Sequence, residues 1–424
     1  MMRRVVVTGL GVIAPNANGV PDFERALREG RSGIRRNEEM AEHGFACQVA
    51  GVPQGVDELA EKSFDAELLM AMNQAHRSVS LASLEAWLDA GLVRPAPEDD
   101  RVDWDSGAVL GTGIGGMDTT AGKVVPLVDA HKVRRLGSTV VEQVMASGVS
   151  ARVSGILALG NQVTTNSSAC STGTEAIIDG CLRIRHGLAE RMLCGGVEAA
   201  SHYIWAGFDS MRVLARRWND APEQASRPLS ASAGGFVPGA GAGVLLLESL
   251  ESAQRRGARI RAEVLGVAVN CGGHRGGGSM TAPNPDGVVR CIRGALADGG
   301  IEADQIDAIN GHFTATGADP REVASWARAL GREPGRMPAL TATKSLIGHA
   351  LGAAGGIECA ASVLMVEGGF VHASRNCEDV HPEIEPFAAS IARETRLQPL
   401  RAIAKAGFGF GDVNAVAVFG KWNP

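Results

Sequence analysis

Short apolar runs alternate with helical patterns along the whole chain, and this alternation limits the fold more than any other feature. The predicted strands are residues 5–7, 107–111, 162–165, 192–196, 243–248, 261–269, 306–311, 402–406 and 415–419. The predicted helices are residues 21–28, 68–92, 140–151, 171–187, 287–299 and 353–367. Strands and helices that alternate in this way build layered α/β folds, in which helices cover the faces of sheets.

The same order of elements occurs twice. Residues 258–424 repeat, more briefly, the order of residues 1–250, which suggests two related halves. The 424 residues are 45% hydrophobic and 21% charged, so the chain can bury a large core and is not disordered. Its formal net charge of −6 provides no overall field for nucleic acid or an anionic membrane, and we expect neither as a partner.

The cysteines and the N-terminus favour a cytoplasmic protein. Eight cysteines stand singly, without the paired spacing of a zinc site, so we expect neither a metal nor disulfides. The apolar run after Arg4 is interrupted by Gly9 and Gly11 and meets Pro15, which is unlike a signal peptide. No stretch approaches the roughly 18 apolar residues that span a membrane.

One cysteine lies where a strand ends and a helix begins. Cys170 stands in the sequence N-S-S-A-C-S-T-G-T-E-A of residues 166–176. The positive end of a helix dipole is expected to lower the pKa of such a thiol and favour the nucleophilic thiolate. Backbone N–H groups at the same place can receive an oxyanion. A buried structural cysteine beside a turn is the alternative, and the flanking residues leave both interpretations open.

Two histidines occupy similar positions. His312 follows a predicted strand in G-H-F-T-A-T-G, and His349 lies in T-K-S-L-I-G-H-A-L-G-A-A-G. Loops at the ends of strands usually carry the site residues of α/β folds. Two such histidines and a cysteine are what a cysteine-dependent acyl-transfer enzyme needs. The F-G-F-G sequence of residues 408–411 could bring backbone and aromatic rings close to a ligand, although such a sequence is more often a simple turn.

The chain resembles the β-ketoacyl-acyl-carrier-protein synthases, condensing enzymes of the thiolase superfamily, nearly from end to end. The matching motifs are R-R-V-V-V-T-G-L-G at residues 3–11, G-I-G-G at 113–116, S-S-A-C-S-T-G at 167–173 and the histidine block at 343–355, while residues 145–151 and 219–223 favour the type I enzymes of bacterial fatty-acid synthesis. The resemblance implies a thiolase-like five-layered α/β/α/β/α fold. Its N-terminal half, residues 1–255, would carry the nucleophile, and its C-terminal half, residues 256–424, both histidines.

The resemblance also implies a reaction, an acyl transfer by decarboxylative Claisen condensation. An acyl chain from acyl-carrier protein would be held on Cys170 as a thioester. His312 and His349 would promote decarboxylation of the malonyl donor, because neutral imidazoles can donate hydrogen bonds to an enolate oxygen. The carbanion would then attack the Cys170 thioester and extend a fatty-acid or polyketide chain by two carbons. No cofactor or metal is implied, since the phosphopantetheine-bound substrates arrive as thioesters.

Further roles are carried over position by position. The N–H groups of Cys170 and Phe410 match the oxyanion hole, with Phe410 also the gate, while Lys344 and Glu358 match a charged pair that orders the site. The substrate-binding positions are Thr314 and Thr316 along the phosphopantetheine arm, Ile114, Phe208 and Phe236 in the acyl pocket, and Phe408; the carrier-protein docking positions are Arg212, Arg216 and Arg217.

The resemblance implies a homodimer, with Ile114 near the interface and the segment around Cys170 near the twofold axis; a heterodimer with a related subunit stays open. Four positions depart from the family pattern: Phe313, Ala240, Asp412 and Val413. Phe313 replaces a small glycine and is predicted to narrow or reroute the pantetheine entrance. These departures suggest a dedicated carrier protein or substrate, in a specialised lipid or polyketide pathway.

Other classes of protein fit less well. A thiolase needs a second cysteine late in the chain, and residues 408–412 contain none. His349 argues against the priming condensing enzymes, which use an asparagine with one histidine. Gly9 and Gly11 imitate a dinucleotide-binding turn, but Pro15 interrupts the helix that would receive the pyrophosphate. The alternative we keep is a non-catalytic partner subunit that sets chain length in an iterative polyketide synthase.

Overall fold

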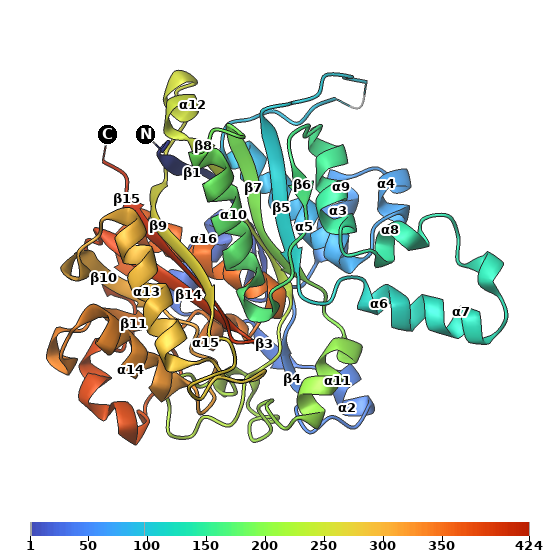
Figure 1. Ribbon diagram of the computed structural model, residues 1–424. Helices are drawn as coiled ribbons and strands as arrows, with labels where there is room; N and C mark the ends of the chain where they lie inside the picture. Colours follow the sequence, from blue (N-terminus) through green and yellow to red (C-terminus); the bar gives the residue numbers. More distant parts are fainter. Residues whose placement is uncertain (1, 97, 424) are drawn as a thin grey trace.

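The computed structural model describes residues 2–96 and 98–423, and its centre is one long twisted sheet (Figure 1). Ten strands follow the order β11-β10-β14-β15-β9-β1-β8-β7-β5-β6, and β2 pairs with β1. Their bounds are β1 Val5–Ala14, β2 Ala17–Asn18, β5 Ser106–Thr112, β6 Val163–Thr164, β7 Arg191–Glu198, β8 Gly241–Ser249, β9 Ala262–Cys271, β10 Ile306–Asn310, β11 Ala339–Thr341, β14 Ala402–Gly409 and β15 Val413–Lys421. Two short ribbons stand apart, β3 (Ile34–Arg36) with β4 (Val49–Gly51) and β12 (Phe370–Val371) with β13 (Arg396–Leu397).

The sheet consists of two sets of five strands with the same pairing pattern. From the middle outward, β1-β8-β7-β5-β6 are joined by two antiparallel and then two parallel ladders. The series β9-β15-β14-β10-β11 is joined in the same succession. A short antiparallel ladder between β1 and β9 connects the two sets. The boundary near residue 255 stays a prediction, although this repeated pairing agrees with two related halves.

Helices complete five layers. α10 (Thr172–Arg185) and α16 (Ala354–Gly368) pack against each other between the two sets of strands. α5 (Gln74–Asp89) and α9 (Gly148–Leu157) cover the outer face of one set, and α13 (Pro285–Gly299) with α14 (Asp319–Leu330) covers the other. The remaining α-helices are α1 Val20–Glu29, α2 Glu38–Glu42, α3 Val56–Ser63, α4 Ala66–Met70, α6 Met117–Thr119, α7 Val125–Asp129, α8 Val140–Val144, α11 His202–Ser210, α12 Leu250–Arg255 and α15 Lys344–Ile347. The order α/β/α/β/α is the one expected from the resemblance.

The glycines of β1 serve helix packing. A Cβ atom on Gly9 would lie 2.0 Å from the carbonyl oxygen of Ala86, and one on Gly11 would lie 1.8 Å from that of Ala82. Both carbonyls belong to α5, so only glycine permits this close contact. β1 runs unbroken through both positions, which confirms that the sequence is not a dinucleotide-binding turn.

Two predicted helices are each split into two shorter helices. The helix predicted over residues 68–92 is two helices in the structure, α4 and α5. α5 starts anew after Asn73, because the Asn73 side chain caps it by accepting from the N–H of His76 at 3.0 Å. The helix predicted over residues 140–151 is likewise split into α8 and α9.

The expectation that no segment is long and apolar enough to span a membrane is wrong. Leu351–Gly368 meets that criterion by length and composition. This segment is α16 with the turn before it, and 89% of it is buried inside the protein. A helix enclosed by both sets of strands is apolar on every side, which explains the composition.

Candidate active site

Cys170 lies in a short 3₁₀ turn, Ala169–Ser171, that leads directly into α10. The following side chain ties this turn to the C-terminal hairpin: the Ser171 hydroxyl lies 3.0 Å from the carbonyl oxygens of both Gly407 and Val413. The nucleophile predicted from the sequence is therefore held between the central helix layer and the β14–β15 hairpin.

The β14–β15 turn brings Phe410 onto the cysteine sulfur. The backbone N–H of Phe410 lies close enough to the Cys170 thiol to lower its pKa. A Cβ atom on Gly409 would lie 2.8 Å from the carbonyl oxygen of Ser168 and 3.1 Å from the amide nitrogen of Cys170. The two backbones approach this closely because residue 409 has no side chain. The N–H groups of Cys170 and Phe410 are thus neighbours, as an oxyanion hole requires.

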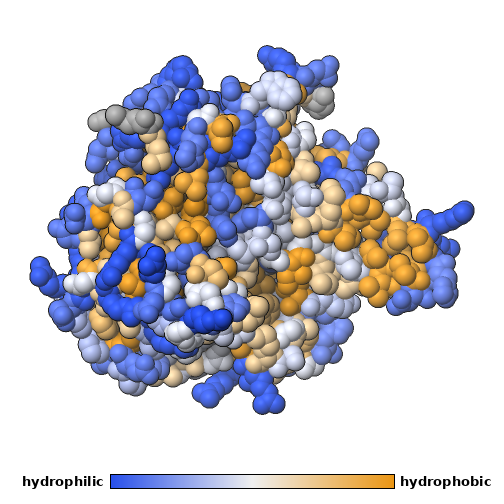
Figure 2. Space-filling view, in the orientation of Figure 1, coloured by the Kyte–Doolittle hydropathy of each residue, from blue (hydrophilic) through white to orange (hydrophobic). Residues whose placement is uncertain are grey.

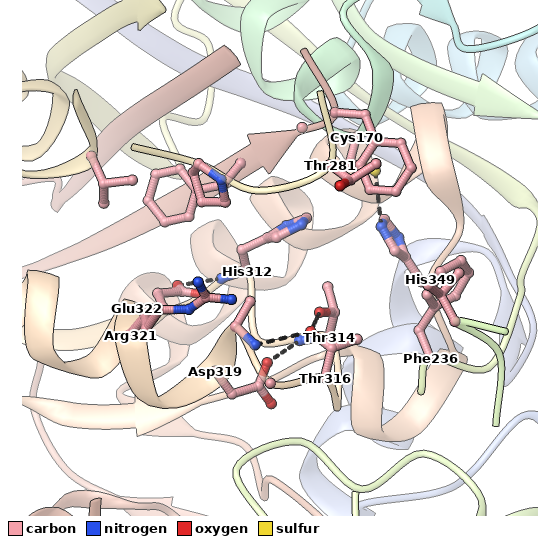
Figure 3. Close-up of a pocket in the computed structure, with 18 of the residues that line it drawn as sticks. Cys170, Phe236, Thr281, His312, Thr314, Thr316, Asp319, Arg321, Glu322 and His349 are labelled. Carbon is pink, nitrogen blue, oxygen red and sulfur yellow. Dashed lines mark hydrogen bonds between the residues drawn. The ribbon is translucent and has the colours of Figure 1, made fainter. Parts of the chain in front are cut away.

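The rings of both histidines point toward the sulfur of Cys170 (Figure 3). The Nε2 atom of His349 lies 3.1 Å from Cys170 Sγ, and its Nδ1 accepts from the N–H of Leu351 at 3.2 Å. The acceptor role of Nδ1 places the proton of a neutral ring on Nε2. The His312 ring lies 5.4 Å from the His349 ring at 84°, and its backbone N–H donates to Glu322 at 2.7 Å.

Burial sets the protonation of the three groups. Burial, with the positive charges of Lys344 and Lys405, holds the pKa of both His312 and His349 well below the usual value, so both rings are neutral. Burial raises the pKa of the Cys170 thiol to about 11, although Lys344 and the Phe410 N–H act in the opposite direction. The expectation that the helix N-terminus lowers this pKa is therefore wrong, because desolvation of the thiolate outweighs the favourable contacts.

The predicted charged pair contains a third member. Lys344 Nζ lies 2.5 Å from Glu358 Oε1, and Lys405 Nζ lies 2.9 Å from Glu358 Oε2. All three side chains are buried. Lys405 was missed by the sequence analysis. Its signal was a lysine inside the apolar strand A-I-A-K-A, because a buried charge in such a strand needs a partner.

A cavity of about 430 Å³ opens over these groups. It is lined by nearly all of the predicted substrate-contact positions: Cys170, Phe208, Phe236, His312, Thr314, Thr316, His349, Phe408 and Phe410. The structure adds Thr281, Asp319, Arg321 and Glu322, which the sequence analysis missed. Asp319 accepts from the N–H of Thr314 at 2.8 Å and of Ala315 at 3.0 Å, so it fixes the loop after His312. The signal in the sequence was the pair of acidic residues, Asp319 and Glu322, that follows H-F-T-A-T within a few positions.

Ile114 and the three arginines lie outside the lining of this cavity. Ile114 is 41% exposed on the surface. Arg212, Arg216 and Arg217 are exposed, and Arg212 is next to the cavity because Met211 and Val213, on either side of it, line that cavity. Arg321 adds a further positive charge at the cavity itself.

The prediction that Phe313 narrows the pantetheine entrance is wrong. Its ring is fully buried in the core beside α14 and does not line the cavity. Ala240 is likewise a core residue. Asp412 adopts a left-handed backbone with φ 60°, and its carboxylate accepts from the N–H of Asn284 at 2.7 Å and of His274 at 3.0 Å. It therefore ties the glycine-rich loop after β9 to the turn that holds Phe410, while Val413 begins β15.

The donor chemistry of the trio fits a thioester better than a metal. The ligand atoms of Cys170, His312 and His349 lie within 4.8 Å of one another. The proton on His349 Nε2 nevertheless faces the sulfur, and the Leu351 N–H disfavours its transfer to Nδ1. A metal needs that lone pair free, whereas a carbonyl or enolate oxygen needs the proton.

A surface group of Glu39, His43 and His202 also brings ligand atoms within 4.8 Å. Its two imidazole rings are stacked at 4.3 Å with 19° between their planes. Rings in this arrangement cannot both direct a lone pair at one ion without rotating, so the group as it stands is not a formed metal site.

The fold and these contacts define a cysteine-dependent acyl-transfer site of the thiolase type. Residues 2–253 match the family described as Beta-ketoacyl synthase, N-terminal domain, and residues 261–378 match Beta-ketoacyl synthase, C-terminal domain. The chain belongs to the β-ketoacyl synthase family.

Named relatives agree over full length. A 3-oxoacyl-[acyl-carrier-protein] synthase 2 from Synechocystis sp. is 35% identical, covering 99% of this chain and 98% of its own. A 3-oxoacyl-[acyl-carrier-protein] synthase 1 from Escherichia coli K12 is 33% identical, covering 99% of both. The solved ishigamide ketosynthase/chain length factor is 31% identical with a TM-score of 0.86, and a β-ketoacyl synthase from Burkholderia phymatum is 28% identical with a TM-score of 0.90; both alignments cover each chain completely.

Proposed function

We propose that this protein is a β-ketoacyl-acyl-carrier-protein synthase, an acyltransferase that condenses a Cys170-bound acyl chain with malonyl-acyl-carrier protein. The contact between His349 Nε2 and Cys170 Sγ at 3.1 Å carries the proposal. It places a neutral N–H donor beside the sulfur, and the nearby Phe410 N–H also acts to lower the pKa of the thiol. The reaction calls for no cofactor, because the substrates enter as activated thioesters.

The first half-reaction loads the cysteine. The Cys170 sulfur attacks the carbonyl carbon of the acyl thioester, and the N–H groups of Cys170 and Phe410 hold the oxyanion. The carbon–sulfur bond to the carrier arm breaks, and the proton lost by the Cys170 thiol leaves with the pantetheine sulfur. Because this thiol has a pKa of about 11, donors that stabilise the anion are needed during the attack.

The second half-reaction forms the new carbon–carbon bond. The carbon–carbon bond to the malonyl carboxylate breaks and releases CO₂, and its electron pair passes into the enolate of the remaining thioester. His312 and His349 donate hydrogen bonds to the enolate oxygen. The enolate carbon attacks the Cys170 thioester, Cys170 leaves as thiolate and regains a proton, and the chain is longer by two carbons.

Acyl-carrier protein is the proposed partner. A related solved structure, 27% identical with a TM-score of 0.87, is described as a type II PKS acyl-carrier protein in complex with its ketosynthase bound to the hexaketide. In this chain Arg321 lines the cavity and Arg212 lies between two lining residues, so an acidic carrier could dock there; Arg216 and Arg217 are exposed a few residues further along the chain. We propose a carrier and substrate of a specialised lipid or polyketide pathway, and a cytoplasmic location, which the eight free cysteines support.

A chain-length-setting partner subunit is the alternative, because one neighbour is a ketosynthase/chain length factor. The assembled Cys170, His312 and His349 disfavour it, since a non-catalytic subunit has no need of a nucleophile.

Intact mass spectrometry after incubation with a panel of acyl-carrier-protein thioesters separates the two functions. We expect an acyl adduct that is lost when malonyl-acyl-carrier protein is added, and no adduct on a Cys170→Ala variant. An intact protein that accepts no acyl chain from any carrier would contradict the condensing function and favour the partner subunit.

A further inference from the structure

Lys405 is a fully buried lysine on β14, three residues before Phe408. Its Nζ lies 2.9 Å from Glu358 Oε2, while the other carboxylate oxygen of Glu358 lies 2.5 Å from Lys344 Nζ. One buried carboxylate therefore serves two buried ammonium groups. With both ammonium groups protonated, the three side chains carry one positive charge more than they balance, although burial lowers the pKa of Lys344.

The other ionisable groups around the site do not supply the missing negative charge in full. Burial raises the pKa of Glu322, on α14, and of Glu198, at the end of β7, to about 7, so each is only partly ionised at neutral pH. Burial also raises the pKa of Asp319, on α14, and this carboxylate is already occupied by backbone N–H groups. The half-buried thiol of Cys170 and the buried thiol of Cys359 stay protonated, since desolvation raises their pKa to about 11 and about 12.

The two imidazoles come from elements next to this cluster. His312 lies two residues after Asn310, which pairs with Lys405 in the β10–β14 ladder, and His349 follows α15, the helix that carries Lys344. Glu358 lies on α16 and Lys405 on β14, so four elements contribute to this region. Lys405 and Lys344 both act on His312 and His349 through their charge, and each disfavours an added proton on either ring.

We propose that Lys405 is a positioning residue for the condensation: by sharing Glu358 with Lys344 it leaves an uncompensated positive charge near the two imidazoles and keeps both as neutral hydrogen-bond donors. This inference rests on the proposed function. Lys344 and Glu358 alone would form a neutral pair, which fixes geometry but exerts little net field. The third charge converts the pair into a field that opposes protonation of the rings. A purely structural role would need no such charge, because an apolar side chain of similar volume could fill the same space.

The test is the pH dependence of malonyl-acyl-carrier-protein decarboxylation in Lys405→Met, which keeps an unbranched side chain of similar length and removes the charge. Protonation of a ring abolishes its use as a neutral donor. Removal of the charge should therefore make protonation easier and move the acid limb of the rate to higher pH. We expect the ratio of the rates at pH 8 and pH 5.5 to be at least threefold larger in the variant than in the wild type. Acylation of Cys170, followed by intact mass, should change much less.

Lys421→Met is the matched control, because Lys421 is an exposed lysine on the neighbouring strand β15. It should keep the wild-type pH profile. A folded Lys405→Met protein with the wild-type acid limb would overturn the inference, even if its melting temperature is lower.

Lys405→Gln provides a second variant for the same pH measurement if the methionine variant does not fold, since its uncharged amide can donate to Glu358. If neither variant folds, the role of Lys405 is structural and the inference is wrong. A wild-type protein that neither accepts an acyl chain nor decarboxylates malonyl thioesters would instead reject the proposed function itself, whatever the variants do.

Discussion

At the scale of single residues, one backbone N–H determines what His349 can do. The Leu351 N–H donates to Nδ1, so the neutral ring offers its proton from Nε2 toward the sulfur. His312 is neutral for the same physical reason, burial, reinforced by nearby positive charge. Two donors converge where an enolate oxygen would form, and a general base is not required there.

Replacement of His349 by alanine should separate the two half-reactions. We expect His349→Ala to accept an acyl chain on Cys170 while malonyl decarboxylation falls by roughly 100-fold or more, as for loss of a donor to a developing oxyanion. Intact mass measures the first step and CO₂ release the second. His186→Ala, at an exposed histidine, is the control. Loss of acylation in the His349 variant would show that the ring acts on the thiol instead.

The pKa shifts predict different pH dependences for alkylation of Cys170 and for malonyl decarboxylation. The pKa of Cys170 is raised to about 11, so the thiolate fraction grows about tenfold per pH unit below that value. Alkylation of Cys170 by iodoacetamide should therefore accelerate steadily from pH 7 to 10. The histidine pKa values are lowered, so decarboxylation should stay level down through pH 6.5. An alkylation rate that is already maximal at pH 7 would show that the thiolate is more stable than burial allows. The Cys170→Ala variant reports alkylation of the other cysteines.

At the scale of elements, the site forms where the β14–β15 turn meets the start of α10. Neither segment holds an oxyanion hole alone, because one N–H group comes from each. Ser171 bonds across this junction, and Gly409 allows the close backbone contact. The turn that holds Cys170 and the turn that holds Phe410 therefore form one structural unit, although about 240 residues separate them along the chain.

Gly409→Ala tests this junction. The added Cβ would lie 2.8 Å from the Ser168 carbonyl oxygen, so the turn must move away from Cys170 and weaken the oxyanion hole. We expect Cys170 acylation to slow by about 100- to 1000-fold, as for loss of one such donor. Gly335→Ala is a matched control, because a Cβ there meets nothing within 4 Å. Equal acylation rates in both variants would show that the Phe410 N–H is not needed.

At the scale of the whole molecule, an arm built from α6, α7 and α8 projects from the body (Figure 1). It carries many exposed apolar side chains, which form an orange area in Figure 2: Val125, Val128, Val133, Val141 and Met145, with Ile114 near its base. The edge strand β6 lies on the same side, beyond β5. An exposed apolar surface of this kind is typical of a protein interface.

We expect this surface to be covered by a second copy of the chain, as the resemblance implies. Sedimentation equilibrium should give twice the 44.0 kDa of one chain. Val128→Asp with Val141→Asp should shift the protein toward the monomer, because each buries a charge in the interface. Glu61→Lys, an exposed charge change on α3, should leave the dimer unchanged. A wild-type monomer would contradict the homodimer and favour a related subunit as the partner that covers the arm.

Much of the molecule could be predicted from the sequence. The alternation of strands and helices predicted the class of fold. Cys170, His312 and His349 were predicted because each lies in a short motif rich in small residues near the end of a strand, where site residues of α/β folds usually lie. The helix break at Asn73 was missed because a cap competes with a continuous apolar pattern, and the break after Val144, where Met145 turns to an extended backbone, was missed as well. The inward turn of Phe313 was missed because the space on either side of a loop depends on distant elements.

The sequence by itself, through its resemblance to the family, therefore singled out Cys170, His312 and His349 as the candidate nucleophile and histidines. Their protonation was decided by tertiary structure. Burial, which raises one pKa and lowers two, arises only when both sets of strands close around the site. Lys405 and the Leu351 N–H become partners of the site only in three dimensions, because electrostatic interactions depend on distance through space and not on separation along the chain.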